Sequence, residues 1–184
     1  MRFQQHSDNI FTIEDLLSQE ECKGYIELSE NNGYEAAKIN TDGGQKVVTN
    51  VRNNNRSFYN SEELAEQLWE KIKSFVPDKI GNSKAIGLNE LFRFYRYQPG
   101  QQFRGHFDES FIRNDVEASY LTFMIYLNED FEGGSTTFPE FWIHPKQGKA
   151  LIFKHDIYHS GREVTRGVKY VLRTDVMYEL TDNE

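Results

Sequence analysis

Two histidines and one aspartate are spaced in this sequence so that they could hold a metal ion. His106-Phe107-Asp108 places an imidazole and a carboxylate two residues apart, and side chains at i and i+2 of a strand point to one face. His159 follows a second strand-like run, residues 150–153. Two imidazoles and one carboxylate form a facial triad, which leaves adjacent metal positions open and suits ferrous iron. The same alternation predicts that Phe107 points away, into apolar packing.

A cationic strand face is expected shortly after His159. In the run 168–173, Lys169 alternates with hydrophobic residues and shares a face with Arg173 and Asp175. A cation that faces the interior of a sandwich is costly unless an anion meets it. The carboxylate of an anionic co-substrate would meet it, whereas a surface strand with its charges outward would show the same spacing.

Four short motifs occur one after another along the chain. They are His106-x-Asp108, Tyr126-Leu127-Asn128, the Gly-Gly-Ser-Thr-Thr-Phe-Pro run of residues 133–139, and His159 followed by Gly167-x-Lys169. This ordered set resembles the prolyl 4-hydroxylase-type 2-oxoglutarate/Fe(II) dioxygenases, closely over about residues 88–178. The resemblance implies a double-stranded β-helix with flanking helices. It also implies Fe(II), 2-oxoglutarate and O2 as cofactor and co-substrates, with ascorbate as a candidate reductant.

The resemblance also implies roles for single residues. His106, Asp108 and His159 would be the iron ligands, and Lys169 would pair with the distal carboxylate of 2-oxoglutarate. The presence of Asp108 argues against halogenation, because halogenating relatives carry a small residue there.

Three further residues are candidates for the co-substrate pocket. Tyr97 and Tyr126 match tyrosines that line it in the family, although an ordinary core position would also explain each of them. Arg173 could contact 2-oxoglutarate or an anionic substrate, or simply pair with Asp175.

A competing motif overlaps the last predicted ligand. Residues 155–159, His-Asp-Ile-Tyr-His, have the spacing of His-Glu-x-x-His zinc peptidases, whose chemistry needs both histidines on one face of a helix. Here the segment follows an apolar strand and meets Gly161, so a helix is disfavoured. His155 is therefore expected to pack or hydrogen-bond near the site and not to be a ligand.

The elements that must position these residues change in character near residue 86. Before it, Ser18 and Glu21 form a capping box, and apolar residues repeat at helical spacing over residues 61–76, with Pro77 after them. After it, short β-branched and aromatic runs alternate with Gly and Pro signals, as in a jelly roll. We expect a mainly β fold with flanking helices (α+β), in one domain of residues 1–184. About residues 1–85 would form a helical and small-sheet support, and about 86–184 the jelly-roll catalytic core.

Composition limits the partners. The 184 residues carry a net charge of −8 and contain no basic run, which argues against nucleic-acid binding. The single cysteine, Cys22, cannot form an internal disulfide, so a reducing, cytoplasmic location is expected. No apolar run is long enough for a membrane span, and the oligomeric state stays open.

The predicted reaction is hydroxylation of an unactivated C–H bond, with release of succinate and CO2. The substrate would be a prolyl residue in a peptide or protein, or alternatively a free amino acid or other small molecule. A non-catalytic jelly-roll module that senses metal or 2-oxoglutarate is the remaining alternative. Two polar segments, about residues 38–55 and 109–118, could act as lids.

Overall fold

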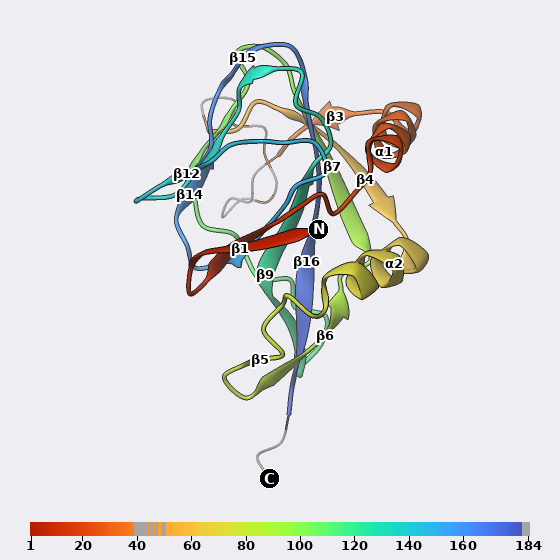
Figure 1. The fold of residues 1–184 in the computed structure, drawn as a ribbon, viewed down its shortest axis with the longest axis vertical. Coiled ribbons are helices and arrows are strands. Elements are labelled where there is room, and N and C mark those ends of the chain that lie inside the picture. The colour runs from red at the N-terminus through yellow and green to blue at the C-terminus, as the bar shows by residue number, and fades with distance from the viewer. Residues whose placement is uncertain (39–43, 45, 47, 49–50, 182–184) are drawn as a thin grey trace.

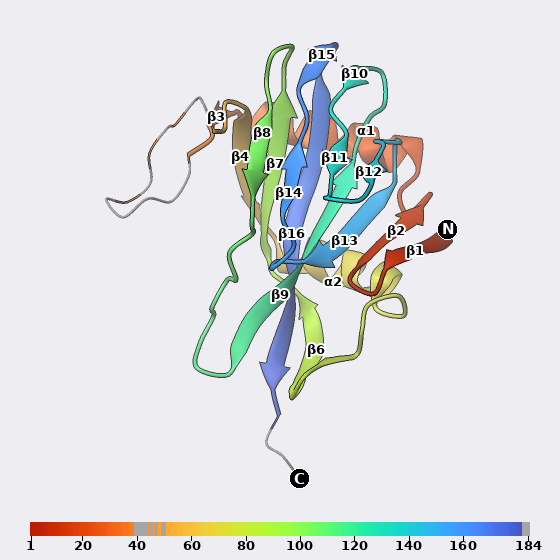
Figure 2. The ribbon, with the colours of Figure 1, turned by 90° about the vertical axis from the view of Figure 1, so that its left-hand side faces the viewer.

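Two antiparallel sheets face each other, and two helices cover the far side of the larger sheet (Figures 1 and 2). The computed structural model describes residues 1–38, 44, 46, 48 and 51–181. The larger sheet contains, in spatial order, β1 (Arg2–Ser7), β2 (Ile10–Glu14), β13 (Ala150–Lys154), β9 (Glu117–Tyr126), β16 (Lys169–Leu180), β7 (Leu91–Tyr97), β4 (Asn55–Asn60) and β3 (Glu35–Ala36), with β6 (Ser83–Leu88) on β16 and β5 (Lys79–Ile80) on β6.

The smaller sheet holds the strands that carry the two histidines of the predicted triad. Its order is β12 (Trp142–Ile143), β11 (Thr136–Thr137), β14 (His159–Gly161) and β8 (Phe103–His106), and a separate ribbon pairs β10 (Glu132–Gly133) with β15 (Val164–Arg166). Facing antiparallel sheets with flanking helices are the double-stranded β-helix arrangement that the sequence predicts.

The two helices begin at the caps that the sequence indicates. α1 (Gln19–Asn32) starts with the capping box, in which Ser18 Oγ accepts from the backbone N–H of Glu21 at 3.1 Å and the Glu21 carboxylate accepts from the backbone N–H of Ser18 at 2.7 Å. α2 (Glu62–Ile72) starts with Ser61 as its cap and ends before the predicted stop at Pro77.

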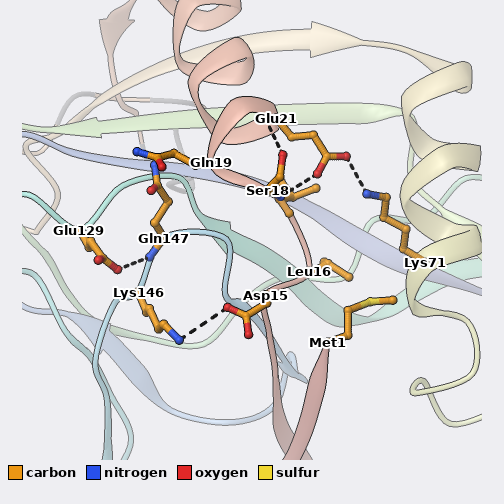
Figure 3. Close-up of a pocket in the computed structure, with 11 residues that line it drawn as sticks. Met1, Asp15, Leu16, Ser18, Gln19, Glu21, Lys71, Glu129, Lys146 and Gln147 are labelled. Carbon is orange, nitrogen blue, oxygen red and sulfur yellow. Dashed lines mark hydrogen bonds and ion pairs between the residues drawn. The ribbon is translucent and has the colours of Figure 1, made fainter.

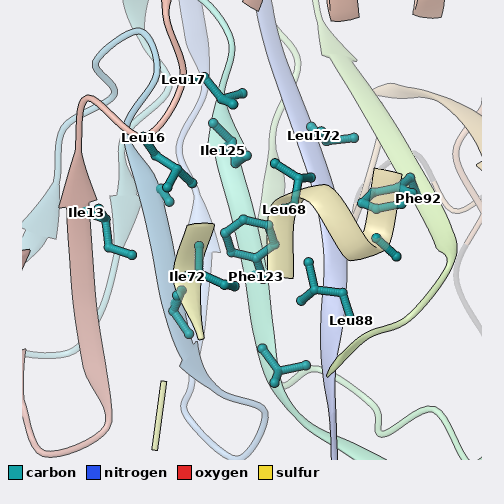
Figure 4. Packing of buried hydrophobic residues seen from close by; sticks show 14 of the residues in the cluster. Ile13, Leu16, Leu17, Leu68, Ile72, Leu88, Phe92, Phe123, Ile125 and Leu172 are labelled. Carbon is teal, nitrogen blue, oxygen red and sulfur yellow. The ribbon is translucent and has the colours of Figure 1, made fainter. Parts of the chain in front are cut away.

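Alternation along the central strands separates two hydrophobic cores. On β7, β9 and β16 one set of side chains packs under the helices, where Leu68 and Ile72 of α2 meet Phe92, Phe123 and Leu172 (Figure 4). The opposite set, which includes Tyr97, Tyr126 and Val171, lies between the sheets. This second face carries the candidate site.

Strands from the first 85 residues extend the same large sheet. β2 pairs with β13, and β4 pairs with β7, where the sequence suggests a small separate sheet. The partners are far away in the chain, so local patterns do not indicate them. Much of the predicted lid at residues 38–55 lies outside the described residues. Within the described residues no helix is long and apolar enough to cross a membrane.

Candidate metal centre

The structure brings His106, Asp108 and His159 together between the two sheets. β8 and β14 pair antiparallel with His106 directly opposite His159, so strand register places both imidazoles on one side. One ligand atom from each of the three residues lies within 4.8 Å of the other two. Nε2 of His106 is 3.5 Å from Oδ1 of Asp108, and Nε2 of His159 is 3.6 Å from Oδ2. This is a compact donor set for one cation.

Backbone contacts fix which imidazole nitrogen faces the centre. Nδ1 of His106 lies 2.7 Å from the carbonyl of Arg104, and Nδ1 of His159 lies 2.9 Å from the carbonyl of Ile157. A carbonyl only accepts, so each Nδ1 must carry the proton and each Nε2 keeps its lone pair. Both rings are therefore oriented and in the tautomer that binds a metal.

The Asp108 carboxylate is held in its ionised form. Burial opposes ionisation, but the Arg173 guanidinium, 3.0 Å away, and the neighbouring imidazoles keep the pKa of Asp108 well below its usual range. Thr122 adds a hydrogen bond of 2.5 Å to Oδ2. Burial lowers the pKa of His159 to about 4. At neutral pH the site thus presents one anion and a neutral His159, as metal binding requires.

Arg173 points at the triad. Its Nη2 lies 3.0 Å from Asp108 and 3.5 Å from Asp175, and Nη1 donates to the Tyr95 hydroxyl at 3.4 Å. The pairing with Asp175 is one of the roles that the sequence leaves open, whereas residue spacing does not indicate the contact with Asp108. Both carboxylates raise the pKa of Arg173, against the effect of burial.

Lys169 is a buried basic residue in the wall of the same cavity. Its side chain, like those of Tyr97, Thr136 and Arg173, lines the cavity that contains the triad, and the residue is only 3% exposed. Nζ donates to the carbonyl of Gly134 at 2.5 Å, and no described carboxylate lies within ion-pair distance of it. Burial accordingly lowers the pKa of Lys169 to about 7.

The two predicted tyrosines flank this ammonium group. Lys169 Nζ lies 5.2 Å from the centre of the Tyr97 ring and 5.3 Å from that of Tyr126. The Tyr126 hydroxyl shares a 2.7 Å hydrogen bond with Thr136. Both rings belong to the core between the sheets. Tyr97 also lines the cavity that contains the triad, whereas Tyr126 is not among the residues that line it.

Two neighbours of the triad, His155 and Phe107, differ in burial. His155 is buried, with Nε2 3.5 Å from Asp175, and it is absent from the donor cluster, as expected. The prediction for Phe107 is wrong: its side chain is 60% exposed, because β8 ends at His106 and the alternation of the strand no longer applies.

A separate hollow of about 520 Å³ lies beside the start of α1 and does not resemble a reaction site (Figure 3). Its charged walls are internally paired, with Lys71 2.7 Å from Glu21 and Lys146 3.6 Å from Asp15. The chemistry of the described residues is therefore concentrated between the sheets.

Comparison with known proteins shows a family similarity around the site. Residues 92–174 match the 2OG-Fe(II) oxygenase superfamily, where 2OG is 2-oxoglutarate, and they span the triad, Lys169 and Arg173. Over these residues, just under half of the chain, the protein is similar to this superfamily.

Named relatives are similar at modest identity. Probable prolyl 4-hydroxylase 7 of Arabidopsis thaliana is 27% identical over 154 residues, which cover 80% of this chain and 45% of the relative. Prolyl 4-hydroxylase 2 of the same plant is 26% identical over 173 residues, covering 78% and 55%. The chain thus spans about half the length of the curated relatives it matches.

Solved structures share the fold. The viral collagen prolyl hydroxylase of Paramecium Bursaria Chlorella virus-1, in its 2OG complex, has a TM-score of 0.67 at 22% identity, covering 94% of this chain and 97% of that one. A prolyl hydroxylase from Trichoplax adhaerens, in complex with a hypoxia inducible factor peptide fragment, has a TM-score of 0.71 at 15% identity, covering 92% and 84%.

Proposed function

We propose that this chain is a 2-oxoglutarate- and Fe(II)-dependent dioxygenase that hydroxylates an unactivated C–H bond. The observation that carries the proposal is that three metal-donor side chains and a buried lysine line one cavity. Lys169 lacks an anionic partner among the described residues, and a buried cation of this kind is costly. A dicarboxylate bound at the triad would supply the missing anion.

The donor chemistry fits the group that the superfamily implies. His106, Asp108 and His159 would hold Fe(II), and Lys169 would hold the distal carboxylate of 2-oxoglutarate by a charge-assisted hydrogen bond. Bound iron, with 2-oxoglutarate and O2, supplies the oxidising power for C–H hydroxylation, with succinate and CO2 as co-products.

The remaining residues orient these groups and exclude water. Arg173 and Thr122 both contact the Asp108 carboxylate, so its direction is fixed from two sides. Met124, Phe153 and Val171 add apolar walls to the cavity that the triad and Lys169 also line. A dry wall strengthens each electrostatic contact inside the cavity and limits side reactions with water.

A prolyl residue in a peptide or protein is the first substrate candidate. The first support is that the relatives are named prolyl 4-hydroxylases. The second is that two hydrophobic side chains, Phe107 and Ile112, are exposed in the groove that contains the metal ligands, as is typical of a surface that binds another chain. A free amino acid is the second candidate. A cytoplasmic location, proposed from the single free cysteine, belongs to the same hypothesis.

Succinate formation tests the function. Protein supplied with Fe(II), 2-oxoglutarate and O2 is incubated with prolyl peptides and free amino acids, and succinate is measured together with product mass. We expect activity that is lost in His159→Ala and in Asp108→Ala. The control His144→Ala, whose imidazole bonds to Ser135 outside the triad, keeps it. If the protein binds metal and 2-oxoglutarate but forms no succinate, with or without a substrate present, the result would instead favour a sensor.

A further inference from the structure

An open groove of about 770 Å³ leads to the triad and has a cationic wall. Its lining includes five basic side chains, Lys38, Arg52, Arg56, Arg93 and Arg173, and three acidic ones, Asp108, Glu109 and Asp175. The whole chain carries a net charge of −8. Positive charge is therefore concentrated at the approach to the site, which favours an anionic visitor.

Most of these arginines are already paired. Arg173 meets Asp108 at 3.0 Å, Arg93 meets Asp175 at 3.1 Å, and Arg56 is 3.1 Å from Glu35. Their charges are directed at the protein itself.

Arg52 is different. It is 6% exposed, and no described carboxylate lies within ion-pair distance of it. Its Nε donates to Asn54 Oδ1 at 2.7 Å, while its buried Nη2 has no hydrogen-bond partner. An unsatisfied buried donor on a charged group costs more than one on a neutral group. The groove wall therefore holds one cationic donor that the described protein does not use.

Aromatic rings hold this guanidinium beside the metal centre. Its central carbon lies 4.3 Å from the ring centres of both Tyr95 and Phe103. The Phe103 ring in turn stacks on His106, with 3.6 Å between ring centres. One aromatic ring thus separates Arg52 from a predicted iron ligand, and cation–π contacts offset part of its desolvation.

Backbone pairing makes the placement rigid. Arg52 bridges Phe103 across an antiparallel contact, and the N–H of Arg104 donates to the carbonyl of Val51 at 2.9 Å. The positive field also acts on Tyr95: burial alone would raise its pKa, but Arg173, Arg52 and Arg93 lower the pKa of Tyr95 to about 8. The site is thus preorganised for negative charge.

We propose that Arg52 is a specificity-determining residue that binds a carboxylate of the hydroxylation substrate. The inference rests on the proposed function and narrows its substrate to an acid-bearing molecule. A planar guanidinium with a free Nη2 suits a carboxylate. The carboxylate comes either from an acidic side chain near the reacting residue of a peptide or from the α-carboxylate of a free amino acid.

Matched probes test the charge and separate its sources. Binding is measured by calorimetry on the whole 184-residue chain, loaded with Zn(II) and 2-oxoglutarate so that no turnover occurs. The peptide arm compares acetyl-Glu-Pro-Gly-amide and acetyl-Pro-Glu-Gly-amide with their Gln counterparts. The amino-acid arm compares L-proline with L-prolinamide. We expect the carboxylate member of at least one arm to bind tenfold or more tightly than its amide.

Variants assign that preference to one side chain. Arg52→Gln should remove the preference, and Arg52→Lys should retain part of it. Arg104→Gln changes the net charge equally on an exposed neighbouring side chain and should leave the preference intact. The comparison of acid and amide probes on the wild type does not depend on whether any variant folds. Circular dichroism checks that each variant is folded.

The outcomes separate this inference from the proposed function. Equal binding of acid and amide, no binding of any probe, or a preference that survives Arg52→Gln would each overturn the role of Arg52. Uncoupled conversion of 2-oxoglutarate to succinate by the Fe(II)-loaded wild type is measured in parallel. Its absence would contradict the proposed function, whereas its presence beside equal binding would contradict the carboxylate inference alone.

Discussion

Binding of 2-oxoglutarate should take up a proton, and Lys169 is the reason. In the free protein burial lowers the pKa of this lysine to about 7 from its ordinary 10.5. A carboxylate placed against the ammonium group favours the charged form and returns the pKa toward its ordinary value. Between about pH 7 and pH 10, the bound state therefore holds a proton that the free state lacks.

The size of the effect follows from this pKa. At pH 6 the free lysine is already about 90% protonated, so uptake is about 0.1 proton, whereas at pH 8.5 it is only about 3% protonated and uptake approaches one. Affinity for 2-oxoglutarate should weaken by about tenfold for each pH unit above 7. Lys169→Met removes the charge-assisted bond, whose 1.5–3 kcal/mol corresponds to a loss of about 10- to 150-fold.

Calorimetry in buffers of different ionisation enthalpy measures this uptake directly. The Mn(II)-loaded protein is titrated with 2-oxoglutarate at pH 6, 7.5 and 8.5, for the wild type and for Lys169→Met. The variant should bind weakly and without proton uptake. Uptake that stays near zero at pH 8.5 in the wild type would refute the reasoning. If Lys169→Met leaves affinity unchanged while Arg173→Gln weakens it, the anchor of the co-substrate is Arg173.

Three further outcomes are expected. Asp108→Ala should weaken Fe(II) binding at least tenfold at pH 7, because it removes a donor and the nearer of the two carboxylates that pair with Arg173. Anaerobic metal titration checks this. The free energy of unfolding of the metal-free protein should fall by on the order of 3 kcal/mol between pH 6.5 and pH 4. The pKa of His159 is lowered to about 4 in the folded state, so over that window the unfolded state binds the proton more tightly and acid favours unfolding. Urea titrations should show this loss in the wild type and not in His159→Gln. Gly148→Ala should destabilise the protein more than Gly81→Ala. Both glycines have a positive φ, but of the two only a Cβ at Gly148 would clash with the backbone, at the carbonyl oxygen of Leu17. Equal changes in the thermal midpoint would contradict this.

Period-two alternation explains why the part of the site on β16 could be predicted from the sequence. Along β16 it places Lys169 and Arg173 on the site face and Leu172 under the helices. The capping box of α1, the serine cap of α2 and the helical repeat are likewise local signals, and the helices form where those signals lie. Local patterns failed where a strand stopped, as at Phe107.

The sequence alone does not indicate a role for Arg52, because distant residues assemble its surroundings. It lies in the run Val51-Arg52-Asn53-Asn54-Asn55, whose asparagines are typical of a turn. Its burial arises from rings on β7 and β8, about forty and fifty residues further along the chain. The contact of Arg173 with Asp108 is equally non-local, and no spacing within one strand indicates it.

The two faces of β16 have a consequence for how this protein can change over time. Leu172 and Val176 contribute to the core under the helices, while Lys169 and Arg173 on the other face line the cavity that contains the triad. Substitutions on the cavity face can therefore alter which molecules are accepted without removing any apolar side chain from beneath the helices. A lineage can vary its chemistry at one set of positions while the other set preserves the ability to fold.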